Sequence, residues 1–355
     1  MRTCRWTGFA AFLNIIATCA GLDFDSDRGS DGVDAAPTRP PLTCNQLATA
    51  APGLRYRLAM ATIVNNEGRW IAEWMIYHRL VGFDHFYIYD DKSSDDTRDV
   101  VRAFEQIGWA TLHDDVEALR RAAGIEIPPH VRFQPQFVIV QHAARTYARE
   151  VEWLGFFDVD EFLFARRGLW CVSDLVARMH RGQGLLRMQG LLFLPNVTDA
   201  APLPAATTLV STAEAFVPFR RIEGRDRVPL HKNFARPSAI ADFDHSGIHH
   251  MMVKPAYGTQ VIKMTDASFA HFRYRTMHDF ALKQKKAYAG HTNKHDVWKH
   301  LRKMLAKYVS QAATISVSHP LRRYAPAVDT AYAAFRRWYA LPEPRPPLRL
   351  TVTFA

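Results

Sequence analysis

The most restrictive feature of the sequence is the stretch 153–162, in which an apolar run ends in three carboxylates. Its residues are Trp-Leu-Gly-Phe-Phe-Asp-Val-Asp-Glu-Phe, so Asp158, Asp160 and Glu161 follow directly on a segment that favours a buried parallel strand. Burying this charge is costly unless a cation or strong hydrogen-bond donors balance it. A strand that simply ends in solvated acids is the alternative. The stretch predicts an open α/β sheet with a cation-binding edge.

Strands and helices are expected to alternate ahead of this stretch. Strands are predicted at 58–64, 84–90 and 109–113, with helices from about 69, through 100–107 and at 136–150. The Pro-containing segment 114–135 is expected to be a long loop. Polar residues follow three strands, namely Asn66 and Glu67, then Asp90 and Asp91, then Asp158 and Asp160. Because the carboxyl ends of parallel strands share one edge, these side chains should converge on one ligand crevice.

The first predicted helix carries a stripe of large residues that we interpret as core. The stripe consists of Trp70, Ile71, Trp74, Met75, Tyr77, His78 and Leu80. A histidine within such a stripe is expected to be buried and hydrogen-bonded rather than a ligand.

The way in which phosphates could be bound is restricted by missing motifs. Neither Gly-x-Gly-x-x-Gly after the first strand nor Gly-x-x-x-x-Gly-Lys-Ser/Thr anywhere occurs in the sequence. A nucleotide would then need a divalent cation to neutralise its diphosphate, and an Asp-x-Asp pair at a strand end supplies hard oxygen ligands for one.

Composition narrows the class of partner and the compartment. The 355 residues carry 45 Lys and Arg against 35 Asp and Glu, a net charge of +10, which favours anionic partners. The four cysteines, at 4, 19, 44 and 171, form no Cys-x-x-Cys pair, so neither a zinc site nor a disulfide is predicted. A reducing, cytoplasmic location is the simpler expectation.

The N-terminal region has a different character. Arg2 and Arg5 precede the short apolar run 8–17, which resembles a signal peptide or a weak signal anchor but is shorter than the ~20 residues of a spanning helix. The acidic, Gly-, Ser- and Pro-containing stretch 23–52 is expected to be disordered, and a start near Met60 is the alternative. We predict the divisions 1–52, 53–290 (donor half 53–165, acceptor half 166–290) and 291–355.

Several ordered motifs resemble glycosyltransferase family 92, once called domain of unknown function 23 and related to family 2. They are Asn-Asn-Glu-Gly at 65–68 with Glu73-Trp74, Tyr-His-Arg-Leu-Val-Gly at 77–82, the stretch 86–97 and the acidic stretch to 163. The resemblance covers roughly 56–290. It implies a GT-A fold, that is, a Rossmann-like, mixed but mainly parallel sheet flanked by helices, with C-terminal helices. It also implies a nucleotide-sugar donor, with a UDP-sugar favoured, and Mn²⁺ or Mg²⁺.

The resemblance assigns roles by position. Asn66, Glu67, Asp90 and Asp91 would lie near the nucleoside, Asp158 would contact ribose or metal, and Asp160 would bind the metal directly. Gln141 matches a Gln-x-x-Ala pattern of the family, with an ordinary helix-surface residue as the alternative. Lys232 would meet either a phosphate or the protein's own carboxylates. The histidine that completes the metal site would be His249, with His271 as the alternative.

Acceptor recognition is less constrained. The predicted core strand 185–194 ends in Phe-Leu-Pro-Asn at 193–196, where the family pattern has a Gly-containing turn, so the acceptor stays open. Candidate bases are Glu214, Glu223, Asp226 and Asp244. Arg273 and Lys283, Lys285 and Lys286 would cover the diphosphate or form a solvated face. Helices at 294–308 and 328–339, ahead of a Pro-rich tail, suggest peripheral contact with a membrane that carries lipid-linked acceptors.

The sequence therefore predicts a metal-dependent glycosyltransferase that transfers a sugar from a nucleotide-diphosphate donor to a glycan or lipid-linked hydroxyl, with inversion and without a nucleic-acid partner. Three alternatives were weighed. A nucleotidyltransferase would need a Gly-rich first loop, and a haloacid-dehalogenase-type phosphatase would not have Glu161-Phe162 after its Asp-x-Asp. A non-catalytic glycan- or polyanion-binding protein on a decayed scaffold would have no need of both Asp158 and Asp160.

Overall fold

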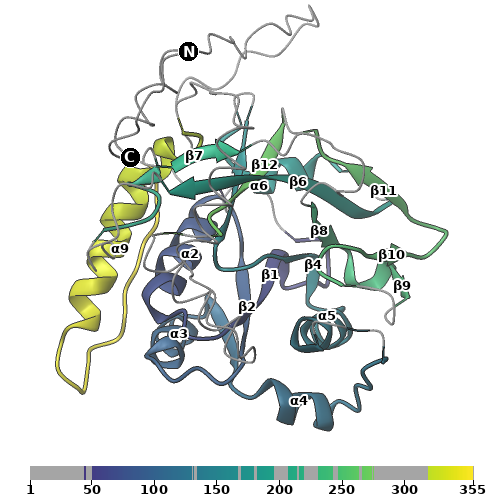
Figure 1. Ribbon diagram of the computed structural model, residues 1–355, viewed down its shortest axis with the longest axis horizontal. Coiled ribbons are helices and arrows are strands. Elements are labelled where there is room, and N and C mark those ends of the chain that lie inside the picture. Colours follow the sequence, from purple (N-terminus) through teal and green to yellow (C-terminus); the bar gives the residue numbers. More distant parts are fainter. Residues whose placement is uncertain are drawn as a thin grey trace, which may run out of the picture.

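The structure of the protein is a computed structural model (Figure 1). It describes residues 44, 50–129, 131, 134–166, 169–179, 182–195, 207–213, 216–219, 231–242, 247–263, 266–273, 275 and 319–354. Among these residues, the helices are too short or too polar for any of them to cross a membrane.

The N-terminal half is a four-stranded parallel sheet in the order β3-β2-β1-β4. Its elements are β1 (Tyr56–Val64), α2 (Gly68–Leu80), β2 (His85–Asp90), α3 (Thr97–Gln106), β3 (Ala110–His113), α4 (Val116–Ala122), α5 (Gln134–Thr146) and β4 (Val151–Phe156). The predicted alternation of strands and helices is confirmed.

The second half extends the same sheet with strands of both directions. It contains β5 (Glu161–Ala165), α6 (Val172–Ala177), β6 (Gln183–Pro195), β7 (Phe216–Phe219), β8 (His231–Ala235), η3 (Pro237–Ala239), β9 (Ile240–Asp242), β10 (Met252–Val253), β11 (Gly258–Val261), β12 (Ala267–His271), η4 (Arg322–Tyr324) and α9 (Ala325–Tyr339). Strand β8 runs antiparallel to both β4 and β6, while β12 is parallel to β6 and antiparallel to β5. The prediction of a mixed sheet flanked by helices, with a C-terminal helix, is confirmed, and the predicted helix at 294–308 lies outside the described residues.

One sequence expectation about the fold is wrong. The segment 114–135, predicted to be a loop, contains the two-turn helix α4. Asp115 caps this helix, since its carboxylate accepts the backbone N–H groups of Glu117 and Ala118 at 3.0 and 2.9 Å. Glu117 also pairs with Arg120 and Arg121, one turn further on. These local interactions stabilise a helix in a segment whose prolines, at 128, 129 and 135, favour a loop.

The acidic stretch divides between two strands. Strand β4 ends at Phe156, and β5 begins at Glu161. The intervening turn is closed by a hydrogen bond from the Glu161 N–H to the Asp158 carbonyl at 3.0 Å. The two aspartates of the Asp-x-Asp pair therefore lie in a short turn at the carboxyl end of β4.

Each face of the sheet has its own hydrophobic core. Helices α2, α3, α6 and α9 cover one face, and α5 covers the other (Figure 1). The predicted stripe of α2 packs into the first core. His78 is fully buried; its Nδ1 lies 2.8 Å from the Trp74 carbonyl and its Nε2 accepts the Leu163 N–H, as the sequence predicted.

A buried carboxylate joins α2 to the acceptor half. Glu73 is completely buried, and its two oxygens accept the backbone N–H groups of Leu209 and Val210, both at 2.8 Å. Arg69, one turn earlier, donates to the Thr207 carbonyl and to the hydroxyl of Tyr332 on α9. Burial raises the pKa of Glu73 to about 7, although the two N–H groups oppose this rise.

Glu73→Gln should reduce the pH dependence of stability. Because the pKa of Glu73 is raised in the folded state, the protonated side chain contributes stability that is present below about pH 4.5 and lost as pH rises through about 7. Thermal unfolding between pH 5 and 7.5 should therefore show a smaller loss of Tm with rising pH in Glu73→Gln than in the wild type. Parallel Tm profiles for the two proteins would contradict the assignment.

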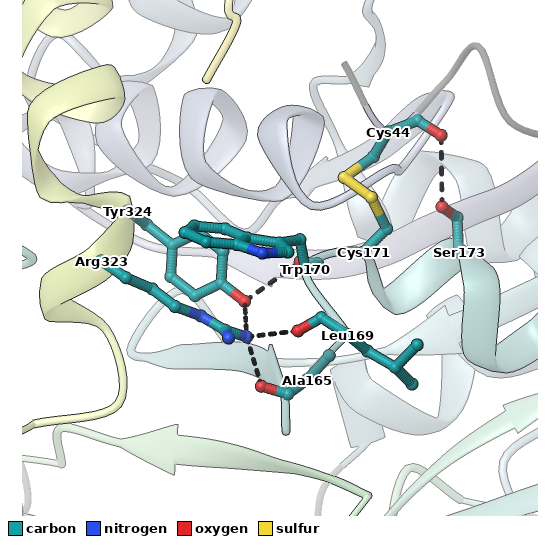
Figure 2. The surroundings of a disulfide bond; sticks show 8 residues. All are labelled: Cys44, Ala165, Leu169, Trp170, Cys171, Ser173, Arg323 and Tyr324. Atoms are coloured by element: carbon teal, nitrogen blue, oxygen red, sulfur yellow. Dashed lines mark hydrogen bonds between the residues drawn. A yellow bond between two sulfur atoms is a disulfide. The ribbon is translucent and has the colours of Figure 1, made fainter. Parts of the chain in front are cut away.

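The structure also corrects the cysteine prediction. Cys44 and Cys171 form a disulfide across a sequence separation of 127. Figure 2 shows this bond beside the start of α6, where the Ser173 hydroxyl donates to the Cys44 carbonyl. Both cysteines are buried, and Gly82 leaves them room, because a Cβ there would lie 3.1 Å from that of Cys44. This pair could not be predicted from the spacing of the cysteines, because spacing identifies only motifs whose cysteines are close together in the sequence.

Removing the disulfide should lower stability substantially. Cys44→Ser is expected to reduce the free energy of unfolding by about 3–5 kcal/mol, because the bond closes a long loop in the unfolded chain. Urea denaturation with and without reductant measures this difference. Cys19→Ser is the control and should behave as the wild type, whereas equal stability of all three proteins would show that the bond is not formed in solution.

Candidate active site

A cavity of about 280 Å³ lies where the carboxyl ends of β1 and β4 meet the end of β12. Its walls come from the two halves of the chain: Ile63, Glu67, Asp158, Val159 and Asp160 from the first, and His271 and Arg273 from the second. The sheet thus brings together five of the residues singled out in the sequence, namely Glu67, Asp158, Asp160, His271 and Arg273.

Lys232 lies beneath this cavity as an internal counter-ion. Its side chain is 1% exposed, and its ammonium lies 2.7 Å from an Asp158 oxygen and 2.8 Å from a Glu161 oxygen. Burial alone would lower the pKa of Lys232, but the two carboxylates raise it above its ordinary value, so the side chain stays charged. Of the two roles weighed for Lys232, contact with the protein's own carboxylates is the one that the structure displays.

The approach of Lys232 depends on a glycine in the acidic stretch. Gly155 on β4 lies opposite Phe234 on β8, and a Cβ at Gly155 would come within 2.6 Å of the Phe234 ring. Because residue 155 has no side chain, β8 can pair closely with β4. This pairing places Lys232 of β8 at the turn after β4.

Glu161 is a structural member of the site. It is 1% exposed, accepts the Asp158 N–H at 3.0 Å and pairs with Lys232. Burial raises the pKa of Glu161, in opposition to the nearby ammonium. It therefore orients Asp158 rather than reaching the cavity.

Asp160 and His271 are direct neighbours in the lining of the cavity. The His271 Nε2 lies 3.5 Å from an Asp160 oxygen, and its Nδ1 lies 3.8 Å from a Glu161 oxygen. Burial lowers the pKa of His271, but the two carboxylates outweigh it and leave the pKa above its ordinary value. His249, the histidine favoured from the sequence, is exposed outside the cavity lining, and its Nδ1 lies 2.8 Å from the His231 carbonyl.

Glu67 is held by an arginine that sequence reasoning missed. Arg275, 4% exposed, donates to a Glu67 oxygen at 2.8 Å and lies over the Trp70 ring at 4.6 Å. The pair fixes the start of α2 against the segment after β12. No local motif marks Arg275, because its partner lies 208 residues away.

Asn66 and Asp90 organise the neighbouring turn. Asn66 adopts a left-handed backbone with φ of 58°, and its side-chain oxygen accepts the Ser94 N–H at 2.7 Å. Asp90 is fully buried and pairs with Arg98 at 2.6 Å, besides accepting the Ser93 N–H. These residues shape the edge of the site without lining the cavity.

The remaining candidates lie elsewhere. Asp91 follows β2, and Gln141 is buried on α5; neither lines the cavity. The candidate bases Glu214, Glu223, Asp226 and Asp244 lie outside the described residues, as do Lys283, Lys285 and Lys286. The nucleoside and metal roles given to individual residues stay predictions.

The cavity has the chemistry of a divalent cation site without a preformed coordination shell. Three carboxylates, those of Glu67, Asp158 and Asp160, and the imidazole of His271 line one small space, a donor set suited to Mn²⁺ or Mg²⁺. Over the described part of the chain, however, three such ligands are nowhere gathered closely enough to hold an ion as they stand. Asp160 and His271 would hold a cation, together with Asp158 if it turned from Lys232, and phosphate oxygens and water would complete the shell.

Lys232→Met should destabilise the fold by about 3–5 kcal/mol, because it leaves two carboxylates without their buried counter-ion. Urea denaturation measures the loss, and Lys232→Met combined with Glu161→Gln should recover part of it. The matched control is Lys254→Met, which removes an exposed lysine. Equal stability of the two single variants would contradict the pairing.

Comparison with known protein families assigns the protein to one of them. The model of glycosyltransferase family 92 matches residues 56–312, more than half of the chain, so the protein belongs to that family. A family 92 protein of Ricinus communis is 25% identical over 243 residues, which cover 64% of this chain and 37% of the relative. One from Arabidopsis thaliana is 24% identical over 245 residues, 65% of this chain and 37% of the relative. The chain thus spans little more than a third of these relatives' length.

Other similarities are shorter or more distant. A galactan β-1,4-galactosyltransferase of Arabidopsis thaliana is 30% identical over 97 residues, 26% of this chain and 17% of the relative. Among solved structures, glucosyl-3-phosphoglycerate synthase from Mycobacterium tuberculosis is 17% identical, with a TM-score of 0.30, over 57% of this chain and 65% of the synthase. The same enzyme bound to Mn²⁺, UDP and glucosyl-3-phosphoglycerate gives a TM-score of 0.25 over 43% of this chain and 52% of the synthase.

Proposed function

We propose that the protein transfers a sugar from a nucleotide-diphosphate donor, with a UDP-sugar favoured, to a hydroxyl of a glycan or lipid-linked acceptor. Membership of glycosyltransferase family 92 supports the reaction class. The observation that carries the proposal is the convergence of Asp158, Asp160, His271 and Arg273 on one cavity at the carboxyl edge of the sheet. This is where open α/β sheets bind their ligands.

The residues in and around the cavity have different roles in the proposed binding of the donor. A bound Mn²⁺ or Mg²⁺ would act as a Lewis acid on the leaving diphosphate. Asp160 and His271 would hold the cation, while Lys232 and Glu161 keep the turn in place. Arg273, which is exposed and lines the cavity, would pair with diphosphate oxygens. The proposed reaction inverts the anomeric centre by direct attack of the acceptor hydroxyl, and no base is assigned among the described residues.

Two of the alternative functions can be compared with the geometry of the site, and they fit it less well. A decayed, purely binding scaffold does not need three carboxylates and a histidine around one cavity. A nucleotidyltransferase would bind the triphosphate with a Gly-rich first loop, whereas here Asn65–Gly68 is tied to the turn 91–97 by side-chain hydrogen bonds.

The disulfide bears on where the protein works. Disulfides persist in oxidising compartments and are rare in the cytosol. We therefore propose the signal or signal-anchor interpretation of the N-terminal apolar run rather than a cytoplasmic location, with peripheral membrane contact where lipid-linked acceptors lie.

Asp160→Asn should lower metal-dependent donor hydrolysis and transfer by at least about a hundredfold, because Lewis-acid stabilisation of the leaving group is worth several kcal/mol. The measurement is UDP release from a panel of UDP-sugars with Mn²⁺, Mg²⁺ or chelator. Arg273→Ala should raise the KM for the donor while leaving Tm unchanged.

Glu126→Gln is the matched control, since it removes an exposed charge outside the cavity. Activity that is equal in Asp160→Asn, in Glu126→Gln and in chelator would overturn the metal-dependent mechanism. Release of inorganic diphosphate from a nucleoside triphosphate would instead indicate nucleotidyl transfer.

A further inference from the structure

A second and larger cavity, of about 470 Å³, lies between α3 and the C-terminal end of α9. It shares no residue with the cavity around Asp160. In Figure 1 these two helices lie side by side, on the side of the sheet away from α5. The lining residues are Asp99, Arg102, Ala103 and Gln106 from α3, and Trp338, Tyr339, Glu343 and Arg345 from the end of α9 and the following turn.

Two aromatic rings form one wall of this cavity and are fixed in position. The Trp338 Nε1–H donates to the Pro346 carbonyl at 2.7 Å, and the Tyr339 hydroxyl lies 3.4 Å from an Asp96 oxygen. Phe335 stacks behind Tyr339 with ring centroids 5.5 Å apart. Because the indole N–H is already used, Trp338 offers a ligand its ring surface, and both rings are ordered before any ligand arrives.

The polar side chains of the cavity leave no excess positive charge. Arg102 lies 3.5 Å from Asp99 and 3.6 Å from Asp114, and Arg345 lies 2.5 Å from Glu343. The Arg345 guanidinium is also 5.4 and 4.9 Å from the centroids of the Trp338 and Tyr339 rings. Because both arginines are paired with carboxylates, and Asp96 lies beside Tyr339, an anionic ligand gains no net attraction here. The same side chains do give a neutral polyol both hydrogen-bond donors and acceptors, as does Gln106.

We infer that this cavity binds a neutral saccharide. Sugar rings have apolar C–H faces that pack on aromatic rings, and equatorial hydroxyls that suit the planar side chains of Arg, Asp, Glu and Gln. The volume falls within the range of small-molecule sites. The site would hold part of a neutral glycan at a distance from the Asp160 cavity, and its existence does not depend on the proposed transfer reaction.

The inference is tested by binding measurements on the whole protein with three tetrasaccharides: β-1,4-linked galactose, β-1,4-linked glucose and α-1,4-linked galacturonic acid. Isothermal titration calorimetry or the change in tryptophan fluorescence gives the Kd. The wild type should bind at least one neutral tetrasaccharide, and more tightly than the galacturonic acid tetramer. Trp338→Leu and Arg102→Ala should each raise that Kd at least about tenfold.

Matched controls separate the site from general effects. Arg337→Ala removes an exposed arginine from the same turn of α9 outside the cavity and should bind as the wild type does. Arg102 is half-exposed, so its variant should keep the wild-type Tm even if Trp338→Leu loses stability. UDP release from the donor should be unchanged in Arg102→Ala, which keeps this test distinct from that of the proposed function.

Three outcomes would overturn the inference. They are no binding of any of the neutral tetrasaccharides, equal Kd values for Arg102→Ala and Arg337→Ala, and tighter binding of the galacturonic acid tetramer than of the neutral ones.

Discussion

The buried ammonium of Lys232 is the interaction on which the arrangement of the site depends. Three carboxylates within four residues cannot be gathered at a strand end without a cation, and Lys232 supplies one from inside the fold at 2.7 and 2.8 Å. It is delivered by β8, which can approach β4 because residue 155 is glycine. The cluster can therefore form without a bound metal, because Lys232 already balances part of its charge.

Charge at the site is divided between the two halves of the chain. The first half contributes Glu67, Asp158 and Asp160, and the second contributes Lys232, His271, Arg273 and Arg275. Neither half alone would balance its charge. The ion pairs Lys232–Asp158 and Arg275–Glu67 thus add to the pairing of β4 with β8 and of β5 with β12 in joining the two halves.

Much of the donor half could be predicted from sequence, because its signals are local. Apolar runs, helical stripes and polar strand ends predict the succession of β1 to β4 along the chain. They also predict that Glu67, Asp158 and Asp160 meet at one edge of the sheet. What failed depends on distant partners. The Cys44–Cys171 bond and the Arg275–Glu67 pair each join residues that are far apart in the chain. Helix α4 was missed for a different reason, since the prolines at 128, 129 and 135 favoured a loop over the whole segment 114–135 although α4 ends before them.

The C-terminal helix α9 is part of the folding unit of this protein. The family match ends at residue 312, yet α9 begins at Ala325 and covers one flank of the first core, where Phe335 stacks on Phe104 at 5.0 Å. Tyr332 and Asp329 of the same helix receive hydrogen bonds from Arg69 and Thr208, beside the buried Glu73. A fragment that ended at residue 312 would lack α9. The Glu73 carboxylate and the apolar side of α2 would then be exposed to water. The unit that this chain needs in order to fold therefore extends beyond the residues that the family model matches.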